Sequence, residues 1–208
     1  MKFECKKCGE CCKKFGVGGY LPLWEWEARK LKEIAKKKNL SLNIQPIDMI
    51  YDKKSSFALF AQYALVQEPC PFLIDNKCSI YENRPLVCRS FPLYETPLLK
   101  EGNIDLSFFI KCPNFNTKKF MLNIGCAENG TLTKFNKGDF IKKYKGTFGE
   151  DIFASAFQID IIRKYLDKMM KYLIQNKKIK LRKVNKLDYH KYNYFVYPQK
   201  SYMCLSAH

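Results

Sequence analysis

The stretch Cys5-Lys6-Lys7-Cys8-Gly9-Glu10-Cys11-Cys12 decides the fold at the start of the chain. Two-residue spacings let thiolates converge on one centre, with tight turns that present backbone N–H groups to the sulfur atoms. Gly9 supplies the freedom to adopt a positive φ that such a turn often needs. Cys5, Cys8 and Cys11 repeat the spacing of cluster ligands in bacterial ferredoxins. Because adjacent residues point in different directions, Cys11 and Cys12 favour a polynuclear cluster or two neighbouring metals over a single zinc ion.

A second group of cysteines lies in the middle of the chain: Cys70, Cys78 and Cys88. Their spacing allows a strand–turn–helix unit to return each sulfur to one site, and prolines stiffen the turns between them. Arg84 and Arg89 flank the last of these cysteines, where their charges can neutralise clustered thiolates and lower the thiol pKa. An ordinary solvated face, or an ion pair with Glu82, is an equally good interpretation of the two arginines.

The remaining cysteines are more isolated. Cys112, followed by Pro113, fits the closing ligand of a cluster, and Cys126 is a further candidate; for both, the alternative is a buried free thiol. Cys204 is a bystander with no cysteine near it in the sequence. The two histidines, His190 and His208, are lone, and we interpret them as surface or core residues.

Ten cysteines are more than this chain needs for stability. At 208 residues it can bury roughly 70% of the surface that its unfolded form exposes, without a metal or disulfide. The N-terminus has no apolar stretch of a secretion signal, and no stretch of about 18 apolar residues could span a membrane. We therefore expect a cytoplasmic protein whose thiols stay reduced and bind metal or do chemistry. An all-sulfur environment favours zinc or an iron–sulfur cluster over magnesium or calcium.

The formal charge of +17 has two interpretations. Only five of the 37 basic residues are arginine, and nucleic-acid surfaces usually carry a larger share of arginine. Richness in Lys, Ile and Asn is typical of an AT-rich genome, and this is the interpretation that we favour. A surface for nucleic acid or for an acidic partner is the alternative. Metal-bound thiolates would lower the charge.

The uneven distribution of the cysteines, together with the hydrophobic periodicity, predicts an α+β fold with two parts. Residues 1–130 form a small cysteine-rich metal-cluster domain with short strands and helices, and residues 131–208 form a Lys-rich, mainly helical extension packed on it. A helix is expected from Leu23 to about Lys38 after Pro22, and one or two buried strands from Ser56 to Val66. Further predictions are a hairpin over Leu98–Leu106 turning at Gly102-Asn103, and a long helix from Glu150 to about Lys177.

Three motifs in order resemble one known family. Cys-x-x-Cys-Gly-x-Cys-Cys is followed by Cys-Pro-Phe-Leu with Cys-Ser-Ile-Tyr-Glu-x-Arg-Pro, and then by Cys-Arg-Ser-Phe-Pro. Over roughly residues 3–115 the chain resembles the zinc- or iron-chelating cysteine-cluster family, also called the YkgJ or CxxCxxCC family. The resemblance implies metal chelation through the following residues: Cys5, Cys8, Cys11, Cys12, Cys70, Cys78, Cys88 and Cys112. Some members continue Cys-Pro-Gly at the last position, where this chain has Cys112-Pro113-Asn114.

The sequence supports three functions of different classes. The first is a protein that chelates an iron–sulfur cluster, of the 4Fe–4S type, or zinc, in a structural, metal-handling or electron-transfer role. The family is also similar to the cysteine-rich part of flagellin lysine N-methylases, which implies as an alternative a cluster-dependent, S-adenosylmethionine-dependent protein lysine methyltransferase. A nucleic-acid-binding module is the third. The expected partner is a metal ion or cluster. A protein partner is left open, and no membrane is expected.

Overall fold

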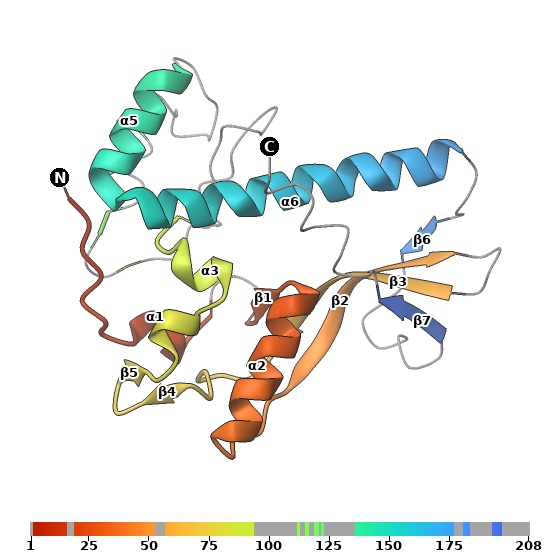
Figure 1. Cartoon of the computed structure of the whole chain (residues 1–208), viewed down its shortest axis with the longest axis horizontal. Helices are drawn as coiled ribbons and strands as arrows, with labels where there is room; N and C mark the ends of the chain where they lie inside the picture. Colours follow the sequence, from red (N-terminus) through yellow and green to blue (C-terminus); the bar gives the residue numbers. More distant parts are fainter. Residues whose placement is uncertain are drawn as a thin grey trace. The chain divides into compact units, whose positions relative to one another are not determined.

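The structure is a computed structural model that describes residues 2–15, 19–52, 57–93, 112, 115, 116, 119, 120, 122, 136–176, 181–183 and 193–196 (Figure 1). The chain divides into two compact units, each made of two segments. The first unit contains Met1–Tyr20 and Glu68–Ile161, and the second contains Leu21–Gln67 and Ile162–His208. The sequence division at residue 130 stays a prediction.

The first unit carries short elements followed by helices. They are α1 (Glu10–Lys13), β4 (Leu73–Ile74), β5 (Lys77–Cys78), the 3-10 helix η1 (Tyr81–Asn83), α3 (Leu86–Arg89), α5 (Lys137–Phe148) and α6 (Glu150–Gln175). Figure 1 shows α1, β4, β5 and α3 close together in this unit. The long α6 begins in the first unit, and its residues from Ile162 onward belong to the second. All eight predicted metal ligands fall within the first unit.

An aromatic cluster forms the core of the first unit. Its buried members are Phe3, Leu93, Phe115, Phe120, Phe140, Tyr144, Phe148, Phe153 and Ala156. Ring centroids of Phe120 and Phe148 lie 4.8 Å apart, and those of Phe115 and Phe148 lie 4.9 Å apart, both edge-on. Edge-to-face pairs of this kind add to the free energy gained by burying the rings. The Phe3 N–H also donates a 2.7 Å hydrogen bond to the Thr147 carbonyl oxygen, which anchors the N-terminal segment to α5.

The second unit is a mixed sheet with one helix packed on it. Besides the part of α6 from Ile162 onward, its elements are β1 (Leu21–Leu23), α2 (Glu25–Lys37), β2 (Ile44–Asp52), β3 (Phe57–Leu65), β6 (Leu181–Lys183) and β7 (Asn193–Val196). The strand order is β1-β3-β2-β6 with antiparallel pairs, and β7 pairs in parallel with the start of β3. Helix α2 contacts β3 and buries Ala28, Leu31 and Ala35, the side chains that recur at helical spacing.

The α+β class and the two predicted helices are confirmed, as α2 and α6. The strand predicted over Ser56–Val66 is also confirmed, as β3. The hairpin predicted over Leu98–Leu106 lies outside the described residues. Among the helices of the described ranges, none combines the length and the apolar character that crossing a bilayer requires.

The expected helix start at Leu23, directly after Pro22, is wrong by two residues. Pro22 instead lies in β1 opposite Ala64, and α2 begins at Glu25. Proline is tolerated there because β1 is the edge of the described sheet, where a strand can lack an N–H donor on its open side. The carboxylate of Glu27, which is 8% exposed, accepts a 3.0 Å hydrogen bond from the Trp24 N–H and so caps the start of the helix.

Candidate metal centre

The first cysteine motif enters the short helix α1 through Gly9. Gly9 has φ +73°, and its carbonyl oxygen accepts the N–H of Cys12 at 2.8 Å. A residue with a side chain pays a steric cost in this left-handed conformation, which explains the glycine. The turn leaves Cys11 exposed and turns Cys12 inward, where it is buried. The sequence prediction of a positive φ at Gly9 is confirmed.

The second motif, which contains Cys70, Cys78 and Cys88, is built around a hairpin with a two-residue loop. Strands β4 and β5 pair Leu73 with Cys78, and the loop residues Asp75 and Asn76 have φ of 49° and 58°. Positive φ at both loop positions is the pattern of the type I′ turn, which favours Asn and Asp. The hairpin carries Cys78 back toward the segment of Cys70.

Two contacts join the motifs although they lie far apart in the sequence. The Cys70 N–H donates a 2.8 Å hydrogen bond to the Cys12 carbonyl oxygen. Gly9 faces the hairpin so closely that a Cβ atom built on it would lie 2.5 Å from the Asn76 carbonyl oxygen and 2.7 Å from Leu73 Cδ1. The absence of a side chain at Gly9 therefore allows α1 to pack directly against the hairpin.

Four sulfur atoms meet at this junction. The Cys12 thiol lies within hydrogen-bond reach of the sulfur atoms of Cys11, Cys70 and Cys78, and we call these four residues the inner thiols. The Cys12 thiol has one proton, which it can donate to one of these sulfur atoms at a time; its own pKa rises, while the pKa of Cys11 falls to about 7 and that of Cys78 to about 6. The pKa of Cys70 is lowered by the same interaction. The contact with Cys12 favours the thiolate forms of Cys11, Cys70 and Cys78, whereas burial and the mutual repulsion of their charges oppose these forms.

Backbone N–H groups and one arginine add to this stabilisation. Beside the hydrogen bonds from Cys12, the Phe72 N–H donates to the Cys70 sulfur and the Ile80 N–H donates to the Cys78 sulfur. In both cases the donor follows the cysteine by two residues, the arrangement that turns around metal-bound thiolates present. The Arg84 guanidinium also favours the charged forms of Cys11 and Cys78. Of the two interpretations of Arg84, the charge near the thiolates is the one that the structure supports.

Cys88 lies within the electrostatic field of the inner thiols. Cys88 is partly buried in α3, which begins directly after Pro85. The Cys88 N–H donates a 2.9 Å hydrogen bond to the Pro85 carbonyl oxygen. Burial raises the pKa of its thiol, and the negative charges of Cys11, Cys70 and Cys78 raise it further, while Arg84 acts in the opposite direction. Cys88 is therefore the protonated neighbour of a negatively charged group.

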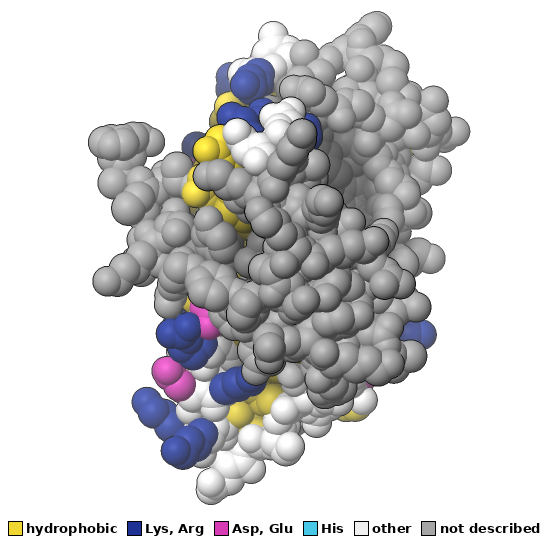
Figure 2. Space-filling view, turned by 90° about the vertical axis from the view of Figure 1, so that its right-hand side faces the viewer, with side chains coloured by type: hydrophobic (Ala, Val, Ile, Leu, Met, Phe, Trp, Pro, Cys, Tyr) yellow, Lys and Arg dark blue, Asp and Glu magenta, His cyan; other side chains and the backbone are white. Residues whose placement is uncertain are grey.

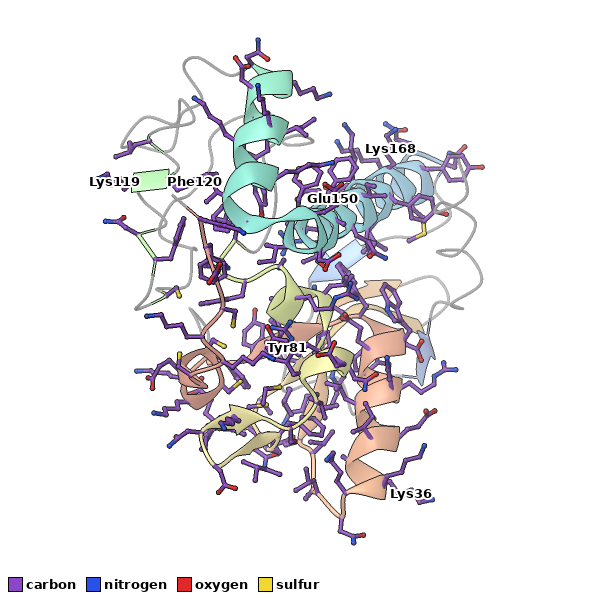
Figure 3. All side chains as sticks on the ribbon, turned by 60° about the vertical axis from the view of Figure 1, so that its left-hand side comes forward. Lys36, Tyr81, Lys119, Phe120, Glu150 and Lys168 are labelled. Atoms are coloured by element: carbon purple, nitrogen blue, oxygen red, sulfur yellow. The ribbon has the colours of Figure 1, made fainter. Side chains whose placement is uncertain are left out.

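The outer cysteines of the first motif are exposed, and one of them contacts an aromatic residue that the sequence analysis did not single out. Cys5 is hydrogen-bonded to the Tyr81 side chain, whose ring also carries the Arg84 guanidinium at 3.5 Å. Burial is the main cause that raises the pKa of Tyr81. Figure 3 shows the labelled Tyr81 among the sulfur-bearing side chains of this unit. The contact could not be anticipated, because a tyrosine in a motif indicates no particular partner.

The remaining candidates are placed differently. Cys112 pairs with Phe115 in an isolated β-bridge and packs, partly buried, against the aromatic cluster. Cys126, Cys204, His190 and His208 lie outside the described residues.

The chemistry of the donor set fits a soft metal. The site has four thiols, three of them with a lowered pKa, together with backbone N–H donors and a nearby guanidinium. This set of groups suits zinc or an iron–sulfur cluster. In the described ranges, no group of three or more Cys, His, Asp and Glu side chains is itself arranged so that it could hold a metal ion. The Cys12 proton is shared with the neighbouring sulfur atoms, and a thiol must lose its proton before it binds metal as a thiolate.

Comparison with known proteins agrees with this chemistry. The chain matches the family model CxxCxxCC, described as a putative zinc- or iron-chelating domain, over residues 4–119. Comparison with curated proteins gives no match, and comparison with solved structures gives none either. The match covers more than half of the chain and includes every cysteine of both motifs as well as Cys112. The chain therefore belongs to the CxxCxxCC family of zinc- or iron-chelating domains.

Proposed function

We propose that the protein binds zinc or an iron–sulfur cluster through the inner thiols Cys11, Cys12, Cys70 and Cys78. Cys5, Cys8, Cys88 and Cys112 are the other predicted ligands. The observation that carries the proposal is the meeting of four sulfur atoms from two distant motifs, held by the hydrogen bond from the Cys70 N–H to the Cys12 carbonyl oxygen. Metal binding would displace the thiol proton that Cys12 shares with its neighbours.

The exposure of the first motif supports a role in transfer of metal or electrons. Cys5, Cys8 and Cys11 are exposed, whereas purely structural metal sites are closed by their ligands. A centre with ligands at the surface can be reached by a donor or acceptor, and electron transfer in particular depends on solvent exposure and on hydrogen bonds to sulfur. We therefore propose that the centre handles metal or electrons, in addition to joining α1 to the hairpin.

Anaerobic purification of the full chain tests the proposal. We expect zinc, or iron with acid-labile sulfide, in stoichiometric amount, and a broad visible absorption if the centre is iron–sulfur. Cys12→Ser and Cys78→Ser should each lose most of the metal, because both residues belong to the inner thiols. Cys204→Ser is the matched control and should keep the metal content of the unmodified chain.

Two results would overturn the proposal. One is a chain that contains neither zinc nor iron after anaerobic purification and takes up neither ion when it is supplied. The other is equal metal content in the Cys12→Ser, Cys78→Ser and Cys204→Ser variants. Circular dichroism on the same samples separates loss of metal from loss of folding, because α2, α5 and α6 dominate the helical signal of the described residues.

A further inference from the structure

Tyr81 holds together three groups that come from two parts of the sequence. Its ring carries the Lys7 ammonium at 4.4 Å from the ring centroid and the Arg84 guanidinium at 3.5 Å. The Arg84 Nε donates a 2.7 Å hydrogen bond to the Tyr81 carbonyl oxygen, which fixes the guanidinium against the ring. A cation over an aromatic face is attracted by the negative potential of that face. Tyr81 therefore connects η1 to the segment that precedes α1.

The hydroxyl of Tyr81 makes the link to a sulfur atom. It is hydrogen-bonded to Cys5, two residues before Lys7. The phenol is a natural donor to a sulfur acceptor, since the O–H of tyrosine is protonated at neutral pH. Ring and hydroxyl thus contact the same short segment at two points, and the contacts lie on either side of Lys6.

The backbone of the N-terminal segment depends on such contacts. Residues 2–8 form neither helix nor strand, and they run between the anchor of Phe3 on α5 and the turn at Gly9. Lys7 has φ of 53°, a left-handed conformation that costs free energy in a residue with a side chain. A strained conformation persists where the surroundings fix it, and the contact of Lys7 with the Tyr81 ring is such a constraint.

We infer that Tyr81 is a positioning residue that holds Cys5, and the exposed segment around it, at the inner thiols. The inference rests on the proposed function, because positioning matters only if Cys5 contributes to the centre. Arg84 connects Tyr81 to the inner thiols, since its guanidinium stacks on the Tyr81 ring and also favours the thiolate forms of Cys11 and Cys78. The hydroxyl of Tyr81 orients Cys5, and its ring holds the cations in place.

The test compares Tyr81→Phe, which removes only the hydroxyl, with Tyr81→Leu, which also removes the ring. Tyr172→Phe is the matched control, because Tyr172 is exposed at 54% on the part of α6 that belongs to the other unit. The metal-free, reduced full chain is alkylated briefly at fixed pH, and mass spectrometry gives the rate at each cysteine. In parallel, loss of zinc from the zinc-loaded chain to a chelator is followed in time.

We expect Tyr81→Phe to raise the alkylation rate of Cys5 roughly 2- to 10-fold, the range that a lost hydrogen bond corresponds to. Tyr81→Leu should raise it further, because the cation contacts are also lost. The rates at Cys12 and Cys70 should not change, and zinc should leave both Tyr81 variants faster than it leaves Tyr172→Phe. Selectivity for Cys5 is the signature of positioning, since general loosening of the fold would accelerate all thiols together.

The inference is overturned if Cys5 reacts at the same rate in all variants, or if Cys12 and Cys70 accelerate as much as Cys5. It is also overturned if the alkylation rate of Cys5 rises but zinc leaves every variant at the same rate. A chain that takes up neither zinc nor iron overturns the proposed function instead, and the alkylation rates then still decide whether Tyr81 orients Cys5.

Discussion

At the scale of single residues, two structural requirements of the site coincide at Gly9. Its left-handed conformation turns the chain into α1, and its missing side chain leaves room for the Asn76 carbonyl oxygen. Both requirements arise at one residue, so no other amino acid satisfies them together. The same position follows Cys8 in the sequence and lies at the junction with the hairpin that carries Cys78.

Gly9→Ala should therefore lower the free energy of unfolding by about 2–4 kcal/mol, the sum of left-handed strain and overpacking. Urea denaturation of the metal-free chain measures the change. Gly146→Ala is the control, because a Cβ there meets nothing within 4 Å and Gly146 is an exposed residue of α5. The control should gain about 1 kcal/mol from the higher helix propensity of alanine. Equal effects of the two substitutions would contradict the close packing of Gly9.

The thiols should differ in reactivity in the order that their surroundings dictate. The Cys12 hydrogen bond lowers the pKa of Cys11 to about 7, and Cys11 is exposed, whereas burial raises the pKa of Cys88. In the metal-free chain, iodoacetamide at pH 7 should modify Cys11 well before Cys88, because the thiolate is the nucleophile. The rate at Cys11 should fall as the pH drops below about 7. Faster modification of Cys88 than of Cys11 at pH 7 would contradict this prediction.

At the scale of elements, the sequence was informative where a pattern is local. Helix α2 and helix α6 follow from residues spaced three and four apart, and β3 follows from its apolar run. Strand β2 was not anticipated, since Pro46 interrupts it and discourages a strand assignment. The proline is accommodated because β6 pairs only with Ile50–Asp52, so the described sheet has no second neighbour for β2 at Pro46.

Helix α5 offers a test of how one element supports the aromatic cluster. The Asn136 side chain accepts the N–H groups of Gly138 and Asp139 at 2.9 and 3.1 Å, and the helix buries Phe140, Tyr144 and Phe148. Asn136→Ala should cost about 1 kcal/mol of unfolding free energy, the usual value for loss of a helix N-cap. Asn136→Asp keeps an acceptor and should restore the stability. Thermal denaturation measures both, and an unchanged midpoint in Asn136→Ala would contradict the role of the cap.

At the scale of the whole molecule, charge and metal binding are connected. The chain carries a formal +17, and each metal-bound thiolate removes one unit of it. Figure 2 shows that Lys and Arg side chains on the described part of one face are accompanied by Asp and Glu side chains. The ion pair between Lys13 and Glu10, at 2.6 Å, is an exposed contact between neighbouring residues of α1. Such pairs contribute little to stability.

Metal should stabilise one unit of the chain selectively. The inner thiols all belong to the unit of Met1–Tyr20 and Glu68–Ile161. At a zinc concentration of 100 times the dissociation constant, binding adds about 2.7 kcal/mol, which corresponds to roughly 100-fold slower exchange of amides that open with the site. Hydrogen exchange should therefore slow in α1 and β4–β5 and stay unchanged in β2 and β3. Uniform slowing in all five elements, or none in α1, would contradict the assignment.

The sequence alone determined which residues could bind metal. Thiol spacing, the glycine after Cys8 and the lack of nearby histidines follow from local chemistry, and the family match agrees with them. Only the tertiary structure decided that Cys12 meets Cys70 and Cys78, that Tyr81 contacts Cys5, and that Cys112 packs against the aromatic cluster. The reason is physical: spacing along the chain fixes turns of a few residues, whereas contacts between distant segments depend on packing that no short pattern records.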